Sequence, residues 1–288
     1  MRNFILDTDW WTDCDDAVAI RLLCNAHLLK KVNLLGININ ACMKDSIPSL
    51  DVFTRDCGVE IPLGIDHSAV NFAGNPSYQK NLAARNPRRF NEDVPDSLDF
   101  YLQLLEQAED NSVEFLSIGF TQCLASLLKN PKYKALLQKK ASHLWIMAGK
   151  WDEVHGKEYN FFKNEMTRAS GAELCKNWPT PITFLGYEVG VTVITGGNLP
   201  AGDLLRQVMV DHGSEKGRCS WDPMLVDLAI TGETEKAGYD AVYGLAAVDP
   251  TDGSNTFMFD SNGKHRYVVK KYDDSFYAEA INSQLVLK

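Results

Sequence analysis

The chain has 288 residues, of which 45% are hydrophobic, enough to build one large domain. Its formal net charge of −9 argues against nucleic acid and anionic membranes as partners. No apolar run approaches the roughly 18 residues of a membrane span. The start of the chain reaches Asp7 too early for a secretion signal, and the seven cysteines form no Cys-x-x-Cys pair. We therefore expect a cytoplasmic protein with reduced thiols.

Short apolar runs alternate with amphipathic segments through the first two thirds of the chain. The apolar runs predict strands over residues 4–6, 32–39, 60–65, 113–118, 143–147 and 182–185. Helical periodicity predicts helices over residues 14–29, 47–57, 96–108, 123–128 and 167–176. This alternation is typical of βαβ units. It predicts an α/β fold with a mostly parallel central sheet and helices on both faces.

Two regions depart from this alternation. Residues 66–95 show no clear periodicity and are rich in Asn, Pro and Arg, and two interpretations stay open for them: an active-site flap and an ordinary long connection. Short strands over residues 241–248, 256–259 and 266–269, separated by Asp-Gly and Asn-Gly, predict C-terminal β-hairpins before a helix over residues 276–281. No repeat or low-complexity linker interrupts the pattern, so we expect a single domain over residues 1–288.

The most informative segment runs from Phe4 to Ile20, where an apolar run, a loop and a helical pattern contain five aspartates. These are Asp7, Asp9, Asp13, Asp15 and Asp16. A hard cation would offset the repulsion among them, because carboxylate oxygens are the ligands that Ca²⁺ and Mg²⁺ prefer. Ligands collect at the carboxyl ends of parallel strands, so we expect a metal site after the first strand. Polar residues in the segments 38–40, 119–122 and 149–160 would converge on the same edge.

Three other interpretations of the aspartates fit less well. An EF-hand loop starting at Asp7 needs Gly and Glu where Thr12 and Val18 stand. An Mg²⁺-dependent phosphatase of the haloacid dehalogenase type begins Asp-x-Asp-x-Thr/Val, but Trp11 occupies the last of these positions. A helix N-terminus that attracts acids accounts for two or three of them rather than five.

The segment Ile5–Ile20, with Asp-x-Asp and then Asp-Asp-Ala, resembles the opening of the inosine-uridine-preferring nucleoside hydrolase family. The loop here is longer than the family's commonest one and carries Asp13. Three further segments are similar to family motifs and follow in the same order: Leu116–Ala125, Met147–Asn160 and Trp221–Met224. The resemblance implies a Rossmann-like nucleoside hydrolase fold and a hydrolase that cleaves the N-glycosidic bond of ribonucleosides.

The same resemblance implies roles for individual residues. A Ca²⁺ ion would be held by Asp9, Asp16, Asp222 and the backbone carbonyl of Gln122, and Asp9 would also be the general base for water. The substrate-binding residues would be Asp15, Asn40, Met147, Glu158, Asn160 and Trp221. Because of the longer loop, Asp13 and Asp15 could exchange roles.

Trp221 stands where many family members have a His that could protonate the departing base. An indole does not titrate but can stack on a purine or a pyrimidine face. The resemblance implies a purine preference, because some purine-preferring members of the family have a Trp at this place. A non-catalytic nucleoside- or ribose-binding relative is therefore the main alternative. The partners that the resemblance implies are a small-molecule nucleoside and further copies of this chain, in a dimer or tetramer.

Overall fold

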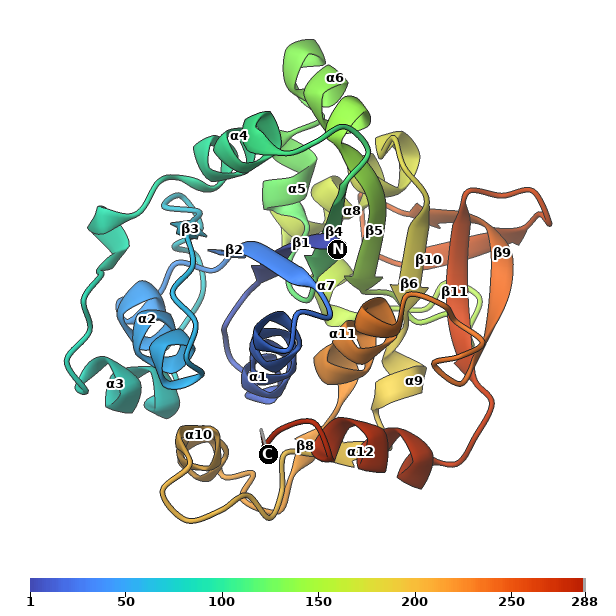
Figure 1. Cartoon of the computed structure of the whole chain (residues 1–288). Coiled ribbons are helices and arrows are strands. Elements are labelled where there is room, and N and C mark those ends of the chain that lie inside the picture. Colours follow the sequence, from blue (N-terminus) through green and yellow to red (C-terminus); the bar gives the residue numbers. More distant parts are fainter. Residues whose placement is uncertain (287–288) are drawn as a thin grey trace.

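The computed structural model describes residues 1–286 and contains a central nine-stranded sheet with the strand order β10-β9-β11-β6-β5-β4-β1-β2-β3 (Figure 1). Every neighbouring pair is parallel except the two pairs that contain β9. The strands are β1 (Asn3–Thr8), β2 (Asn33–Ile39), β3 (Leu63–Ile65), β4 (Val113–Ser117), β5 (Ala141–Met147), β6 (Ile182–Leu185), β9 (Tyr239–Val248), β10 (Asn255–Phe259) and β11 (His265–Lys270). The predicted mostly parallel sheet is confirmed.

Helices cover both faces of this sheet and bury two separate hydrophobic cores (Figure 1). One core receives α1 (Asp15–Leu28), α2 (Ser46–Asp56), α3 (Ser77–Ala83), α9 (Tyr187–Gly190), α10 (Leu204–His212), α11 (Trp221–Thr231) and α12 (Asp274–Asn282). The other receives α4 (Ser97–Gln107), α5 (Gln122–Ser126), α6 (Pro131–Lys140), α7 (Tyr159–Phe162) and α8 (Glu165–Asn177). Side chains alternate along β1, so that Phe4 and Leu6 enter the first core and Ile5 the second.

The three C-terminal strands extend the main sheet. β9 and β10 form an antiparallel hairpin, and β11 returns to pair antiparallel with β9 and parallel with β6. The predicted short C-terminal strands are therefore confirmed as an edge of the same sheet. A separate two-stranded sheet joins β7 (Ile194–Thr195) to β8 (Arg218–Cys219).

Some elements were not predicted from the sequence. α6 has clear start signals, because Pro131 is its first residue and the Asn130 side chain accepts a hydrogen bond from the Lys132 backbone N–H. It buries only Leu137, so its hydrophobic periodicity is weak. The segment 66–95 contains α3 and a 3₁₀ turn (Asn91–Asp93). Within residues 1–286, no helix combines the length and apolar character needed to cross a bilayer.

Candidate functional site

A pocket of about 210 Å³ lies at the carboxyl ends of β1, β4, β5 and β6. Parallel strands deliver the residues that follow them to one edge of the sheet, which explains why distant segments meet there. The pocket is lined by Asp9, Trp11, Thr12, Asp13, Asp15, Asp16, Ile118, Met147, Glu158, Tyr159, Asn160, Tyr187, Arg218, Trp221 and Asp222. Eight of the ten residues predicted as site residues are in this set, and the exceptions are Asn40 and Gln122.

Three carboxylates meet at one end of the pocket. Asp15 and Asp16 lie in the first turn of α1, Asp222 lies in the first turn of α11, and one oxygen of each lies within 4.8 Å of the others. The two helices pack against each other (Figure 1). The backbone N–H of Asp222 donates a hydrogen bond to the Asp15 carboxylate at 3.2 Å. We call Asp15, Asp16 and Asp222 the acidic triad.

Burial makes these carboxylates hard to ionise together. Burial raises the pKa of Asp16 to about 7, although a hydrogen bond from the Thr8 hydroxyl lowers it. Burial, followed by repulsion from neighbouring carboxylates, raises the pKa of Asp15 and of Asp222 well above the usual range. A divalent cation would relieve this repulsion, and the all-oxygen donor set suits a hard cation. The residues present therefore fit a Ca²⁺ or Mg²⁺ ion.

Asp9 lines the same pocket from the loop between β1 and α1. Its carboxylate accepts a hydrogen bond from the Trp11 backbone N–H at 3.1 Å, and burial raises its pKa well above the usual range, with repulsion from Asp16 as the next cause. Trp10, which lies between Asp9 and Trp11 in this turn, has a φ of 48°, which is uncommon for a bulky side chain. The Trp10 carbonyl accepts hydrogen bonds from the Tyr78 hydroxyl at 3.1 Å and from the Gln79 amide, so α3 holds the turn in place.

The turn after β4 approaches Asp9 closely at Gly119. A Cβ atom at this position would lie 2.4 Å from the Asp9 backbone nitrogen and 3.0 Å from Nδ2 of Asn40. Only glycine fits this approach. Asn40 is thus buried beside Asp9 behind the pocket lining, where its side-chain oxygen accepts a hydrogen bond from the Phe120 backbone N–H at 3.1 Å.

Gln122 is the second predicted site residue outside the pocket lining. Its side-chain amide donates to the Asn40 carbonyl at 2.6 Å and to the Asp66 carboxylate at 3.4 Å. Gln122 and Asp66 line a neighbouring cavity. From the same segment of the chain, Leu116–Ala125, the residue that lines the pocket is Ile118. The Gln122 carbonyl as a cation ligand stays a prediction.

A second wall of the pocket carries the residues predicted to hold the far side of a sugar. The buried Glu158 carboxylate accepts hydrogen bonds from the backbone N–H groups of Asn160 at 2.9 Å and Gly149 at 3.1 Å. The Asn160 amide donates to the Met147 carbonyl at 2.9 Å. Burial raises the pKa of Glu158 to about 7. The sequence segment 147–160 therefore folds back on itself and presents one carboxyl and one amide to the pocket.

A third wall is aromatic and cationic. Trp221 stacks on Tyr187 with ring centroids 5.4 Å apart, and its indole N–H donates to the Tyr187 carbonyl at 2.8 Å. The Arg218 guanidinium lies 5.8 Å from the Trp221 ring centre and forms an ion pair with Asp13 at 2.6 Å. Of the two aspartates that could exchange roles, the structure thus places Asp15 in the acidic triad and pairs Asp13 with Arg218.

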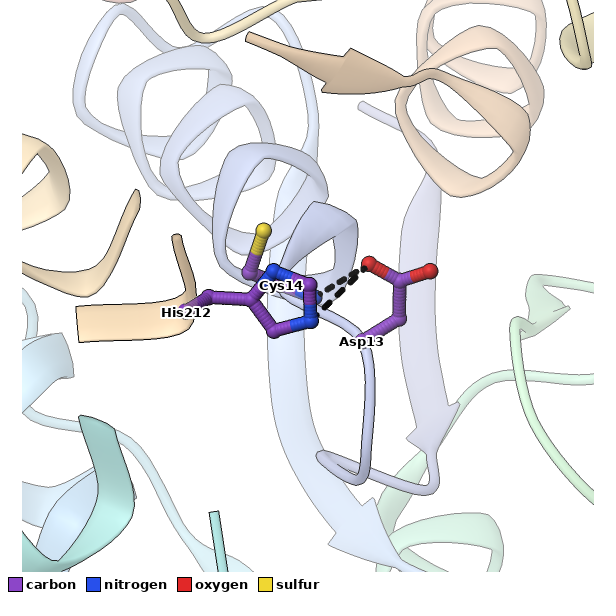
Figure 2. A group of neighbouring side chains, drawn as sticks. All are labelled: Asp13, Cys14 and His212. Carbon is purple, nitrogen blue, oxygen red and sulfur yellow. Dashed lines mark hydrogen bonds and ion pairs between the residues drawn. The ribbon is translucent and has the colours of Figure 1, made fainter. Parts of the chain in front are cut away.

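A further group of potential ligands lies beside this wall. Figure 2 shows Asp13 facing the His212 imidazole, with Cys14 next to them, and the ligating atoms of the three lie within 4.8 Å of one another. Nε2 of His212 is 3.8 Å from the Asp13 carboxylate. Because that carboxylate already forms an ion pair with Arg218, this group is a weaker cation candidate than the acidic triad.

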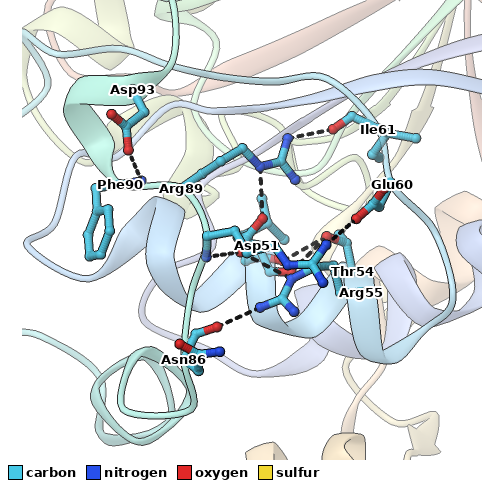
Figure 3. Close-up of polar contacts among 11 residues, drawn as sticks. Asp51, Thr54, Arg55, Glu60, Ile61, Asn86, Arg89, Phe90 and Asp93 are labelled. Carbon is cyan, nitrogen blue, oxygen red and sulfur yellow. Dashed lines mark hydrogen bonds and ion pairs between the residues drawn. The ribbon is translucent and has the colours of Figure 1, made fainter.

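The segment 66–95 lies behind the pocket and contributes no lining residue. The buried Asp51 of α2 ties it down (Figure 3) by accepting from the Arg89 side chain at 2.8 Å and the Arg88 backbone N–H at 2.7 Å. Burial alone would raise the pKa of Asp51, but these bonds and the nearby guanidinium groups lower it. Of the two interpretations for this segment, the structure favours a connection that supports the loop after β1.

Sequence reasoning missed Thr12, Ile118, Tyr159, Tyr187 and Arg218 among the lining residues. Tyr187 follows the end of β6, so the strand-end rule that found Asp9 would also have found it. Arg218 comes from the two-residue strand β8, which has no periodicity of its own. Only tertiary pairing with β7 reveals its position.

The fold can be compared with those of known proteins. Searches against protein-family models and against curated proteins found no match. Among solved structures, the chain has the fold of nucleoside hydrolases. It matches an inosine-guanosine nucleoside hydrolase with a TM-score of 0.71 at 16% identity, covering 99% of each chain. It also matches a purine-preferring ribonucleoside hydrolase from Gardnerella vaginalis with a TM-score of 0.73 at 18% identity, covering 99% of this chain and 98% of that one.

A further match is the type III effector protein XopQ, solved in complex with adenosine diphosphate ribose. The TM-score is 0.68 at 12% identity, and the alignment covers 99% of this chain and 93% of that chain. At these identities the likeness establishes the shared fold.

Proposed function

We propose that this protein is a cation-dependent nucleoside N-ribohydrolase, which converts a ribonucleoside and water into ribose and the free base. The observation that carries this proposal is the acidic triad. Its carboxylates come from α1 and α11 and meet at one end of a pocket with aromatic and amide walls. The fold shared with two nucleoside hydrolases supports the proposal. The resemblance of the Asp-x-Asp and Asp-Asp-Ala motifs points the same way.

The proposed cation is Ca²⁺, held by Asp9, Asp16, Asp222 and the Gln122 carbonyl. Bound there, it would supply Lewis-acid chemistry by holding ribose hydroxyls and lowering the pKa of a bound water. Asp9 would take the proton from the attacking water, and Asp15 would accept a hydrogen bond from a ribose hydroxyl. The remaining tasks belong to the opposite wall.

Glu158 and Asn160 would hold the far side of the sugar. Cleavage of an N-glycosidic bond passes through an oxocarbenium-like sugar, so groups that fix the ring and place negative charge near it lower the barrier. Glu158 is already oriented by two backbone N–H groups. Asn160 is oriented by its bond to the Met147 carbonyl.

A purine is the proposed base. Trp221 and Tyr187 present a stacked aromatic surface at the pocket, and purines offer a larger face for stacking than pyrimidines. Two of the similar structures are named as an inosine-guanosine and a purine-preferring hydrolase, which supports this choice over an inosine-uridine preference.

Hydrolysis of single nucleosides tests the proposal. Purified protein is incubated with inosine, guanosine, uridine or cytidine, in Ca²⁺ or in excess chelator, and released ribose is measured as reducing sugar. We expect ribose from the purine nucleosides in Ca²⁺ and loss of product in chelator. Absence of ribose from all four nucleosides in Ca²⁺ would contradict the proposal.

A non-catalytic nucleoside or ribose binder is the second candidate, because Trp221 offers no titrating proton for a departing base. Calorimetry that detects ribose binding, with no product after long incubation, would favour it. The phosphatase alternative loses support, since its nucleophile would be Asp7. That carboxylate is fully buried outside the pocket lining, where it accepts from the Asn38 amide and the Tyr101 hydroxyl, each at 2.8 Å.

We also propose a homo-oligomer, which the resemblance implies, and a cytoplasmic location, which the cysteine usage suggests. Light scattering on the purified protein tests the first, since a dimer or tetramer has two or four times the mass of the chain. A monomeric mass at micromolar concentration would contradict it.

A further inference from the structure

Arg218 is the only cationic residue among those that line the pocket in the described part of the chain. It comes from β8 and stands three residues before Trp221, and no motif of the sequence assigns it a role. Six carboxyl groups line the same pocket, namely Asp9, Asp13, Asp15, Asp16, Glu158 and Asp222. Arg218 is therefore placed where its charge offsets part of this negative charge.

The pairing with Asp13 leaves one side of the guanidinium free. Nε donates to the two Asp13 oxygens at 2.8 and 2.9 Å, and Nη2 donates to one of them at 2.6 Å. Such a fork fixes the plane of the group. Within residues 1–286, Nη1 of Arg218 makes no hydrogen bond to the protein, and the side chain is 38% exposed. The Asp13 carboxylate is itself held by the Cys14 backbone N–H at 2.7 Å.

The contact with Trp221 places Arg218 on the aromatic wall of the pocket. In the proposed function, the acidic triad and the pair Glu158–Asn160 hold the sugar, so a base would extend toward the wall that contains Trp221. The indole N–H of Trp221 is already used by the Tyr187 carbonyl. Within residues 1–286, Nη1 of Arg218 is therefore a charged donor without a protein acceptor, in a guanidinium 5.8 Å from the Trp221 ring centre.

We propose that Arg218 contacts the leaving base, to which Nη1 donates a hydrogen bond, and that Asp13 positions it there. This inference rests on the proposed hydrolase function. As the C1′–N bond breaks, its electron pair moves to the base, and the guanidinium charge stabilises that developing negative charge. Water supplies the hydroxyl that bonds to C1′, Asp9 takes the water's proton, and the base gains a proton from solvent. Arg218 keeps all of its protons, because a guanidinium does not lose a proton near neutral pH.

Two substrates with different leaving groups test this role. The base of inosine, hypoxanthine, is a poor leaving group whose developing negative charge needs stabilisation, whereas p-nitrophenyl riboside releases the stable p-nitrophenolate anion without help. With Arg218→Gln, we expect kcat/KM in Ca²⁺ to fall roughly 100-fold for inosine and less than about threefold for p-nitrophenyl riboside. Arg218→Lys keeps the charge without the fork, so its loss on inosine should be smaller. Asp13→Asn should show the same substrate bias, because it releases the guanidinium.

Arg206→Gln is the matched control, because Arg206 lies on α10 outside the pocket lining and forms an exposed ion pair with Glu215. We expect no change on either substrate. Equal losses on both substrates in Arg218→Gln would overturn the inference and show a purely structural ion pair. If that variant does not fold, Arg218→Lys decides by the same comparison. Wild-type protein that cleaves neither substrate would instead refute the proposed function.

Discussion

Asp222 is the residue on which the site depends most, because it lies 207 positions after Asp15 and still donates a backbone hydrogen bond to it. No local pattern relates the two. Within this fold, α1 and α11 pack together and point their first turns at the same point. Carboxylates placed in this way near helix N-termini also gain from the helix dipoles.

Removal of the Asp16 carboxylate should weaken cation and sugar binding together. In Asp16→Ala, we expect Ca²⁺ affinity to fall at least roughly 100-fold, because a ligand is lost and the Thr8 hydroxyl loses its acceptor. Isothermal titration with Ca²⁺, and then with ribose in Ca²⁺, measures both affinities. The exposed Asp110 gives a control, since Asp110→Ala should leave both unchanged. Wild-type Ca²⁺ affinity in Asp16→Ala would contradict the proposed ligand set.

Truncation of the aromatic wall should separate the two base classes. Trp221→Ala removes the ring that stacks on Tyr187 and, by the proposal, on the base. We expect KM for inosine to rise roughly tenfold and KM for uridine to rise less, because base stacking contributes about 1–3 kcal/mol. Steady-state kinetics on both nucleosides measure this. Equal rises would instead assign Trp221 to packing.

Glu158 should give the metal-free protein a pH-dependent stability. The pKa of Glu158 in the folded protein, about 7, exceeds its ordinary value of 4.5. The stabilising contribution of this carboxyl to the free energy of unfolding is therefore complete below pH 4.5 and is lost as pH rises through 7. This shift corresponds to about 3 kcal/mol at most. Thermal melts of metal-free Glu158→Gln from pH 4 to 8 should therefore show a flatter decline than the wild type. Glu279→Gln, at an exposed position of α12, should keep the wild-type slope, and an unchanged slope in Glu158→Gln would contradict the prediction.

At the scale of single elements, strand ends explain most of what the sequence could predict. Asp9, Met147 and the segment 119–122 were placed correctly at strand ends, because an apolar run followed by polar residues marks the sheet edge. Elements whose partners are distant gave no such signal. The two-residue strands β7 and β8 exist only because they pair with each other, so the position of Arg218 could not be read from local sequence.

The turn between β4 and α5 leaves no room for added volume at Gly119. In Gly119→Ala, the new methyl group would lie 2.4 Å from the Asp9 backbone nitrogen, which forces the loop after β1 to shift. We expect a loss of about 2–3 kcal/mol in unfolding free energy, with weaker Ca²⁺ binding. Urea denaturation and calorimetry measure the two effects.

The same substitution at Gly202 gives a matched control. Nothing lies within 4 Å of a Cβ there, and its φ of +90° leaves backbone strain as the only cost. We expect Gly202→Ala to lose about 1 kcal/mol without a change in Ca²⁺ affinity. Comparable Ca²⁺ affinity in Gly119→Ala and the wild type would show that the turn does not position Asp9.

At the scale of the whole molecule, the alternation of apolar runs and amphipathic segments was sufficient to predict a mostly parallel α/β sheet, which the structure confirms. The two hydrophobic cores explain why, since each strand must be apolar on both faces. The helix α6 was missed because it buries only Leu137, which leaves little hydrophobic periodicity in its sequence.

A bound cation should stabilise the entire fold, because it would link α1 to α11. At a Ca²⁺ concentration of 100 times Kd, the added stability is about 2.7 kcal/mol, which corresponds to a rise in Tm of about 5 °C or more. The rise should be larger at pH 8 than at pH 5, because burial raises the pKa of Asp16 to about 7 and protons then compete with the cation. Scanning fluorimetry at both pH values, with chelator as the control, measures this. A rise equal at both pH values would contradict it.

The distance along the chain between the members of the acidic triad has a consequence for biosynthesis. A ribosome releases β1 and α1 first, so Asp15 and Asp16 leave the exit tunnel long before Asp222 is translated. During that delay the nascent polypeptide contains the neighbouring carboxylates Asp15 and Asp16 without Asp222, the third member of the acidic triad. A product of premature termination before Trp221 would retain the Asp-rich opening but lack the helix that completes it.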